Sequence, residues 1–235
     1  MEVYNKNRDQ NHSIHDEIRE QNAKLKDAPL KEKLAYFKEY YLKTTLVVIA
    51  ALIVIVCIGY SMITAPDDTG FAAYFFNNVG DSSDTTMLDE FVEYIDLDTK
   101  EHDAYIDAAM HYNPDAQNYE SVYVGIEKSW AVMSSGELDI IVGDQMAFDY
   151  FAKGGSFADI TTILPEDLLD RFQDKLYYYT DEETGETLPV GIYVSDSPQL
   201  KEHSYYLDKE PILGFVVNSN SMDNAISFLR FLYTE

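Results

Sequence analysis

The feature that most constrains this chain is an uncharged, almost wholly apolar run from Thr44 to Ala65. Its centre, Leu46 to Ile63, reads LVVIAALIVIVCIGYSMI, and these 18 residues would rise by about 27 Å as a helix. That length is close to the thickness of the hydrocarbon core of a bilayer. A buried core helix of this length usually has a polar face, and this run has none. We therefore expect residues 44–65 to form a transmembrane helix, with the lipid bilayer as a partner.

A cleaved signal peptide and a lipoprotein signal are two other interpretations of such a run. A signal-peptidase site would place Ile63 and Ala65 at the two positions that need small residues, which is a poor match. A lipoprotein site at Cys57 would follow Val56, where a small residue is expected, and would lie in the middle of the span. An uncleaved anchor fits these residues better.

The charges on either side of the run predict its orientation. Six lysines lie between Lys24 and Lys43, whereas Asp67 and Asp68 follow the run and the next basic residue is Lys100. The positive-inside rule places the lysine-rich flank in the cytoplasm. We therefore expect a single-pass protein of the cell membrane, with its N-terminus in the cytoplasm and residues 66–235 outside the cell.

Nearly all of the acidity belongs to the part of the chain after the run. Residues 1–43 hold nine basic and eight acidic residues, whereas residues 66–235 hold the other eight basic and 34 acidic residues. Such a negative field disfavours nucleic acid and anionic membrane surfaces as partners. It suits solubility in a cation-rich exterior, and weak cation binding is the alternative. Residues 66–235 also lack cysteine, which favours the envelope of a Gram-positive bacterium.

The residues before the run predict two segments. Residues 1–26 are polar and rich in Asn, Asp and Glu, which is the composition of a disordered tail. Residues 27–43 predict an amphipathic juxtamembrane helix, with Asp27 as its cap and Pro29 in its first turn. Tyrosines and lysines at its end are typical of an interfacial belt that anchors a span. A binding site for a cytoplasmic partner is the alternative for this flank.

After the run, short apolar strands alternate with longer amphipathic helices. Strands are expected over residues 71–77, 103–111, 138–142, 177–180, 187–194 and 212–218. The fourth and fifth of these flank the turn Glu183-Thr184-Gly185, which predicts a hairpin or paired strands. Helices are expected from Asp81 or Asp84 onward and over residues 115–135, 145–153, 165–176 and 222–233. This alternation predicts an α/β fold over residues 66–235, with three layers and a mostly parallel sheet.

The order of several short sequences resembles a known family. The sequences SSGELDIIVGD, AFDYFAKGGSFADIT, LPEDLLDRFQDKLYYYT and TLPVGIYVSD follow one another within residues 134–196, and GFVVNSNSMDNAISFLRFL begins at Gly214. Together they resemble the N-terminal lobe of bacterial extracellular solute-binding proteins of the maltose-binding type. The resemblance implies a periplasmic-binding-protein-like fold, a small solute as ligand, and the permease of an ABC transporter as a partner.

The chain departs from that family in two ways. Members carry a second lobe between the hairpin strands and the returning strand, whereas here only residues 195–211 fill that gap. We expect this segment to be a loop, which leaves a single lobe that binds a small solute weakly because it buries little ligand surface. Relatives in Gram-positive cells are usually lipoproteins, whereas this chain has a predicted span.

Polar side chains at the ends of the predicted strands are the candidate ligand residues, because ligands of open α/β sheets bind where strands end. They are Asn77 and Asn78 after the first strand, Asp144 and Gln145 after the third, and Tyr193 in the fifth. The resemblance gives Asp144 the place where family members often present a ligand-contacting polar residue. Each has an ordinary alternative: the asparagines as turn formers, Asp144 as a helix cap and Tyr193 as a packing residue.

No catalytic or metal-binding pattern is complete. The triplet Asp68-Thr69-Gly70 is that of aspartic proteases, but it occurs once and the chemistry needs two carboxylates. Asp96, Asp98 and Asp107 match three positions of an EF-hand loop that lacks its glycine. The histidines do not have the spacing of a zinc site. We therefore expect no enzyme activity, no cofactor and no metal.

Two function classes stay open. One is a non-enzymatic binding or sensing module that is held outside the membrane and works beside a transporter or another envelope protein. The other is a structural or interaction domain that keeps the fold and has lost small-molecule binding. A melting-temperature screen against solutes separates them, because only the first class predicts a ligand-specific rise.

Overall fold

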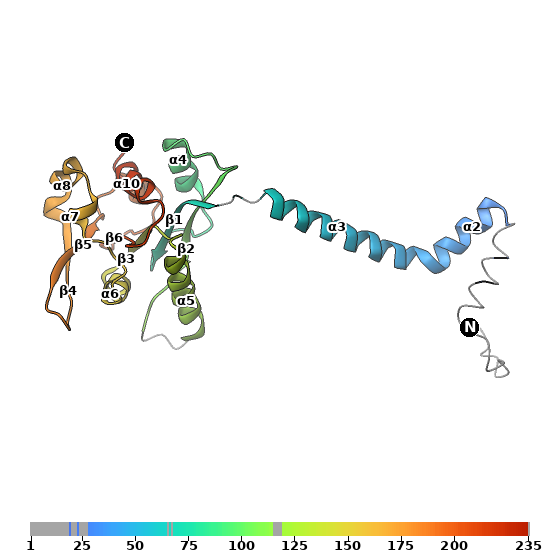
Figure 1. The fold of residues 1–235 in the computed structure, drawn as a ribbon, viewed down its shortest axis with the longest axis horizontal. Coiled ribbons are helices and arrows are strands. Elements are labelled where there is room, and N and C mark those ends of the chain that lie inside the picture. The colour runs from blue at the N-terminus through green and yellow to red at the C-terminus, as the bar shows by residue number, and fades with distance from the viewer. Residues whose placement is uncertain are drawn as a thin grey trace. The chain divides into compact units, whose positions relative to one another are not determined.

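The chain divides into two compact units, Met1–Thr64 and Ala65–Glu235, each of which is described by itself (Figure 1). The computed structural model describes residues 19, 23, 28–64, 66, 68–114 and 119–234. The predicted tail, apart from two residues, and the predicted helix cap Asp27 therefore lie outside the described residues.

The first unit is helical from Leu30 onward. Helix α2 spans Leu30–Tyr36, a π-helical segment spans Phe37–Tyr41, and α3 spans Leu42–Thr64. Within α3, the part Leu42–Ser61 is long and apolar enough to cross a membrane. Its apolar side chains are exposed, with Val47 and Val56 at 69% and 68%. A helix that is apolar on all sides is typical of a segment that lies in an apolar environment, such as the hydrocarbon core of a bilayer.

The second unit is built on a mixed sheet of six strands. They are β1 Asp68–Phe76, β2 His102–Met110, β3 Ile140–Gly143, β4 Leu176–Thr180, β5 Thr187–Tyr193 and β6 Ile212–Phe215, in the spatial order β2-β1-β3-β6-β5-β4. Strand β1 is parallel to β2 and β3, whereas the pairs β3–β6, β6–β5 and β5–β4 are antiparallel.

The prediction of a mostly parallel sheet is therefore wrong. A parallel neighbour needs a crossover connection of a dozen or more residues, usually a helix. Between β4 and β5 the chain turns back through a short hairpin, which allows only antiparallel pairing. Strand β6 then enters between β3 and β5 and runs against both of them.

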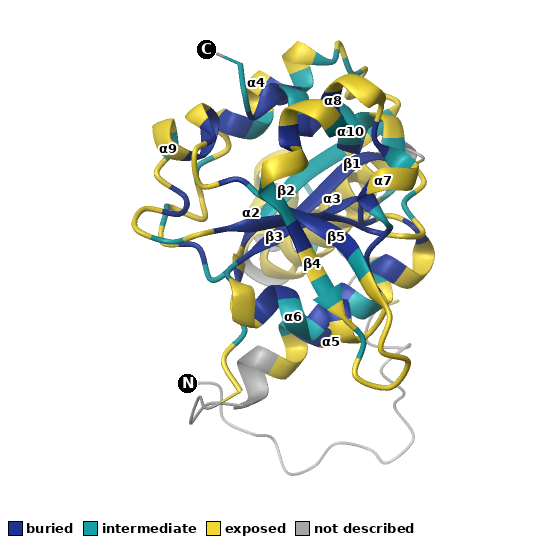
Figure 2. Cartoon of the chain, turned by 90° about the vertical axis from the view of Figure 1, so that its left-hand side faces the viewer, coloured by how far each residue is buried: buried dark blue, intermediate teal, exposed yellow. Residues whose placement is uncertain are grey.

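Helices cover both faces of the sheet, which gives the three layers that the sequence predicts (Figure 1). One face carries α4 Thr86–Tyr94, α7 Ile160–Ile163, α8 Glu166–Phe172 and α10 Met222–Phe231. The other face carries α5 Tyr119–Ser135 and α6 Gln145–Lys153. Side chains alternate between two cores along each strand, so that Phe75 of β1 lies in one core and Phe76 in the other. Figure 2 shows the central strands as the most deeply buried part of this unit.

The expected loop over residues 195–211 contains a short helix, α9, at Pro198–Glu202. Ser197 caps it by accepting a hydrogen bond from the Leu200 amide, and Pro198 occupies its first turn. Leu200, Tyr205 and Tyr206 are buried in the core that also contains α10. The segment is thus a packed part of the unit rather than a surface loop.

Candidate functional site

Two of the predicted ligand residues meet at the carboxyl ends of neighbouring strands. Asn77 directly follows β1, Asp144 directly follows β3, and these two strands pair with each other. The Asn77 side-chain amide donates to the Asp144 carboxylate, with Nδ2 at 3.0 Å from Oδ1 and 3.2 Å from Oδ2. Asn77 has a φ of 55°, a left-handed conformation that asparagine tolerates better than most residues. The two side chains therefore form one hydrogen-bonded pair at this edge of the sheet, which we call the strand-end edge.

Both residues of this pair also have structural contacts. Asp144 caps α6, because its Oδ1 accepts a hydrogen bond from the Ala147 amide at 3.2 Å. The Asn77 side chain exchanges two hydrogen bonds with the backbone of Tyr112, at 2.8 Å and 2.9 Å. Those bonds connect the end of β1 to the chain that leaves β2. These contacts are the ones expected of Asp144 as a helix cap and of Asn77 as a turn former, the two ordinary alternatives to ligand binding.

Residues 195–211 place a lysine directly on the strand-end edge. Lys209 donates through Nζ to the backbone carbonyl of Asn77, and Nζ lies 3.5 Å from Asp144 Oδ2. A cation of the chain itself therefore lies between the strand ends, where the ligand of the predicted site would bind. The Lys209 and Asp144 side chains are one-third or less exposed, which reduces the screening of this ion pair by water.

A buried tyrosine of the same segment contacts the strand ends as well. The Tyr206 hydroxyl lies 3.0 Å from the carbonyl oxygen of Phe76 and 2.9 Å from that of Val142, which share its proton. Burial raises the pKa of Tyr206 well above its usual value, so the hydroxyl stays protonated and remains a donor. Carbonyl groups near the ends of β1 and β3 thus accept a hydrogen bond from within the chain.

The same segment contacts helix α4 and the chain before it from its other side through His203 and Tyr205. His203 lies with Nε2 at 3.4 Å from Glu90 Oε2 and with Nδ1 at 3.9 Å from Asp84 Oδ2. The Tyr205 hydroxyl donates to the backbone carbonyl of Asp84 at 3.1 Å, and the Tyr205 carbonyl accepts from the Val79 amide at 2.8 Å. The two Tyr205 hydrogen bonds fasten the segment to the chain that leads into helix α4.

The other three predicted residues have different surroundings. Asn78 is buried, and its side-chain amide donates to the backbone carbonyl of Ala108 in β2. Gln145 and Tyr193 both lie beside Tyr177: Gln145 Nε2 is 3.5 Å from the Tyr177 hydroxyl, and the Tyr193 ring packs edge-on against the Tyr177 ring. That hydroxyl donates to the Asp149 carboxylate. The five candidates therefore divide among three surroundings, and the strand-end edge is the one where two of them hydrogen-bond to each other.

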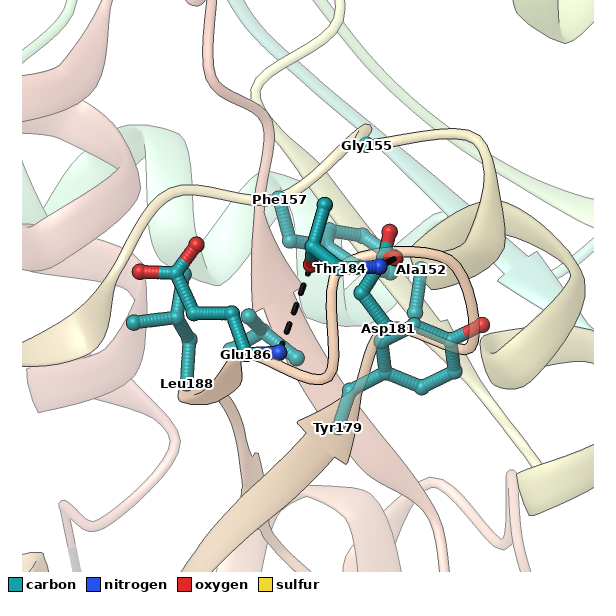
Figure 3. Close-up of a pocket in the computed structure, with 9 residues that line it drawn as sticks. Ala152, Gly155, Phe157, Tyr179, Asp181, Thr184, Glu186 and Leu188 are labelled. Atoms are coloured by element: carbon teal, nitrogen blue, oxygen red, sulfur yellow. Dashed lines mark hydrogen bonds between the residues drawn. The ribbon is translucent and has the colours of Figure 1, made fainter.

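A pocket that the sequence did not indicate lies beside the β4–β5 hairpin (Figure 3). Its volume is about 190 Å³. Apolar and aromatic side chains make most of its wall, and two carboxylates stand on the hairpin side. The lining residues are Ala152, Gly155, Phe157, Tyr179, Asp181, Thr184, Glu186, Leu188 and Val190.

The hairpin turn orders the polar side of this pocket. Asp181 Oδ1 accepts hydrogen bonds from the amides of Glu183 at 2.8 Å and Thr184 at 2.7 Å. These bonds hold the pKa of Asp181 below its usual value, so this carboxylate is charged at neutral pH. Gly185 follows with a φ of 72°, which a glycine adopts without strain. The two glycine turns around residues 155 and 185 were the signal in the sequence, but their spacing does not show that they meet.

No protein-family profile, curated protein or solved structure matches this chain. The likeness to solute-binding proteins therefore stays a prediction from the sequence.

Proposed function

We propose that this chain is a single-pass membrane protein whose residues 66–235 form a non-catalytic interaction domain outside the cell. The observation that carries the proposal is the occupation of the strand-end edge by Lys209 and Tyr206. A solute receptor leaves such strand ends free for its ligand. Here a solute would first have to displace an ion pair and a buried hydroxyl, which favours the interaction domain over the solute receptor.

The membrane part of the proposal depends on α3 and its flanks. The stretch Leu42–Ser61 has the length and composition of a span. The lysines before it and the aspartates after it favour a cytoplasmic N-terminus and an external C-terminal domain. The partner that fits this placement is a transporter permease or another envelope protein, whereas the negative charge disfavours nucleic acid.

From the sequence resemblance to one lobe of a solute-binding protein, this proposal takes the fold and not the ligand. In that comparison residues 195–211 stand where members of the family carry their second lobe. A lobe without its partner has no hinge that closes over a ligand. The segment instead packs on the lobe it belongs to, which is consistent with a fold that is kept and a solute site that is lost.

The test is a melting-temperature screen of the full chain in lipid nanodiscs against sugars, peptides and cations. We expect no ligand to raise the melting temperature through the strand-end edge. A rise that Asp144→Asn abolishes would overturn the proposal and identify a solute receptor. Glu166→Gln is the matched control, because Glu166 is an exposed acid at the start of α8.

A further inference from the structure

The pocket beside the hairpin is too small for a free solute of ordinary size. Sites for small molecules enclose about 300–1,000 Å³, whereas this pocket encloses about 190 Å³. That space suits a single side chain presented by a larger partner. The size of the pocket therefore fits one side chain of a partner protein.

The wall of the pocket combines an apolar surface with negative charge. Phe157, Leu188 and Val190 line it with carbon atoms, and Asp181 and Glu186 stand at its hairpin side. Figure 3 shows the Glu186 carboxylate at the rim beside Leu188. Glu186 has no ion pair within the described part of the chain, in contrast to Asp144. An apolar wall below an uncompensated carboxylate matches a side chain with a hydrocarbon stem and a cationic head.

We propose that this pocket receives one lysine or arginine side chain from a basic segment of a partner protein. The stem packs on Leu188 and Val190 while the cation lies near Glu186 and Asp181. The charge of the whole domain acts in the same direction, because residues 66–235 hold 34 acidic and only eight basic residues. This inference rests on the proposed interaction function and names the chemistry of the partner.

The mouth of the pocket offers a way to block it without disturbing its wall. Gly155 has a φ of 69°, and a Cβ added there would meet no atom within 4 Å. Asparagine tolerates this left-handed conformation better than other residues that carry a side chain. The variant Gly155→Asn therefore places a polar side chain at the mouth with little strain.

The experiment is methyl NMR on the full chain in nanodiscs, with a capped Gly-Lys-Gly peptide as the probe. We expect saturable shifts of the Thr184 and Leu188 methyl signals with this peptide. The matched Gly-norleucine-Gly peptide keeps the hydrocarbon stem without the charge, and we expect it to bind more weakly. Gly155→Asn should abolish the shifts while the rest of the spectrum is kept.

Two variants of one hairpin separate the pocket from the general negative field. Glu186→Gln should lower the affinity for the lysine peptide about two- to five-fold, which is the range expected for loss of a partly exposed ion pair. Glu183→Gln removes the same charge from an exposed residue of the same turn that does not line the pocket. It should leave the affinity unchanged.

Three results would overturn the inference: equal binding of both peptides, equal weakening by the two variants, or tighter saturation of the same methyl signals by calcium ions or phosphatidylcholine vesicles. The last result would assign the pocket to an ion or a lipid headgroup. Failure of the proposed function has a different signature, because a solute at the strand-end edge would shift the Val142 and Ala147 methyl signals. The two failures are therefore distinguishable.

Discussion

The strand-end edge and the hairpin pocket differ in how their charges are compensated. At the strand-end edge, Asp144 has Lys209 as an internal counter-ion, and buried carbonyls have the Tyr206 hydroxyl. At the hairpin pocket, Glu186 has no cation among the described residues and the wall beneath it is apolar. The comparison teaches that the polar groups at the edge where a sheet of this kind is expected to bind its ligand have partners within the chain. The hairpin pocket instead leaves a carboxylate without a cation among the described residues.

The largest expected effect on stability is at Tyr206, whose hydroxyl donates to backbone carbonyls at the strand-end edge. Tyr206→Ala should lower the free energy of unfolding by about 3–5 kcal/mol, as for other buried aromatic side chains. Tyr206→Phe should cost about 0.5–1.5 kcal/mol, because it removes the buried hydroxyl that donates to the Phe76 and Val142 carbonyls. Denaturant unfolding followed by the fluorescence of Trp130, the single tryptophan, measures both.

The control for Tyr206 is Tyr178, which is 56% exposed on β4. Tyr178→Phe should change the stability by less than about 0.5 kcal/mol. Equal effects of the two phenylalanine variants would show that the strand ends do not depend on the Tyr206 hydroxyl.

The second prediction concerns Asp139, which directly precedes β3 and, unlike Asp144, has no cationic partner among the described residues. Asp139 is buried and accepts hydrogen bonds from the Ala72 amide at 2.7 Å and the Ser219 hydroxyl at 2.5 Å. Burial raises the pKa of Asp139 from 3.8 to about 6, although those hydrogen bonds oppose the shift. The folded state therefore binds the proton more tightly than the unfolded state does.

The sign of the resulting pH dependence follows from linkage. The contribution of Asp139 to stability is fully present below about pH 4 and is lost as the pH rises to about 6, on the order of 2–3 kcal/mol. The difference in unfolding free energy between the wild type and Asp139→Asn should decline across that window. A difference that stays constant from pH 4 to pH 6 would contradict the prediction.

The third prediction concerns the ion pair on the strand-end edge. Lys209→Ala should cost about 1 kcal/mol, because the pair is partly exposed. Propylammonium, which matches the deleted end of the side chain, should raise the melting temperature of this variant more than that of the wild type. Lys153→Ala is the control, since the Lys153–Glu182 pair is at 3.4 Å and largely exposed. Equal responses of the two variants to propylammonium would show that the strand-end edge has no specific cation site.

The smallest expected effect on stability is at the hairpin pocket. Glu186→Gln should change the free energy of unfolding by less than about 0.5 kcal/mol, as for other surface substitutions. Its effect should appear in binding of the lysine peptide instead. A large loss of stability on thermal unfolding would show that the pocket is a structural element, like the strand-end edge.

Much of the secondary structure is predictable because it depends on local pattern. Helix α6 spans Gln145–Lys153, the bounds that the sequence predicts, and the Asp144 cap is visible in the chain itself. Helix α9 was missed because five residues are too few to show a periodicity, although Ser197 and Pro198 are a start signal. The hairpin of β4 and β5 was visible in its turn residues, whereas the antiparallel entry of β6 between β3 and β5 was missed because that pairing depends on how distant strands are connected.

The candidate site was predictable only in part. The sequence places Asn77 and Asp144 after two strands, and β1 and β3 turn out to be neighbours. It does not show that Lys209 reaches Asn77, because the two residues are 132 positions apart. The hairpin pocket is a similar case, since Gly155 and Thr184 come from turns that the chain pattern treats as independent.

The sequence by itself determined that the chain has one helix long and apolar enough to span a membrane, and that an acidic α/β unit follows it. The length, composition and hydrophobic period of a segment depend only on residues close in the sequence, so they can be evaluated without knowing the tertiary contacts. Only the tertiary structure decided which polar groups of that unit find a partner within the chain and which line a pocket. Those outcomes depend on contacts between residues far apart in the chain, where one lysine or one glycine turn determines what can bind.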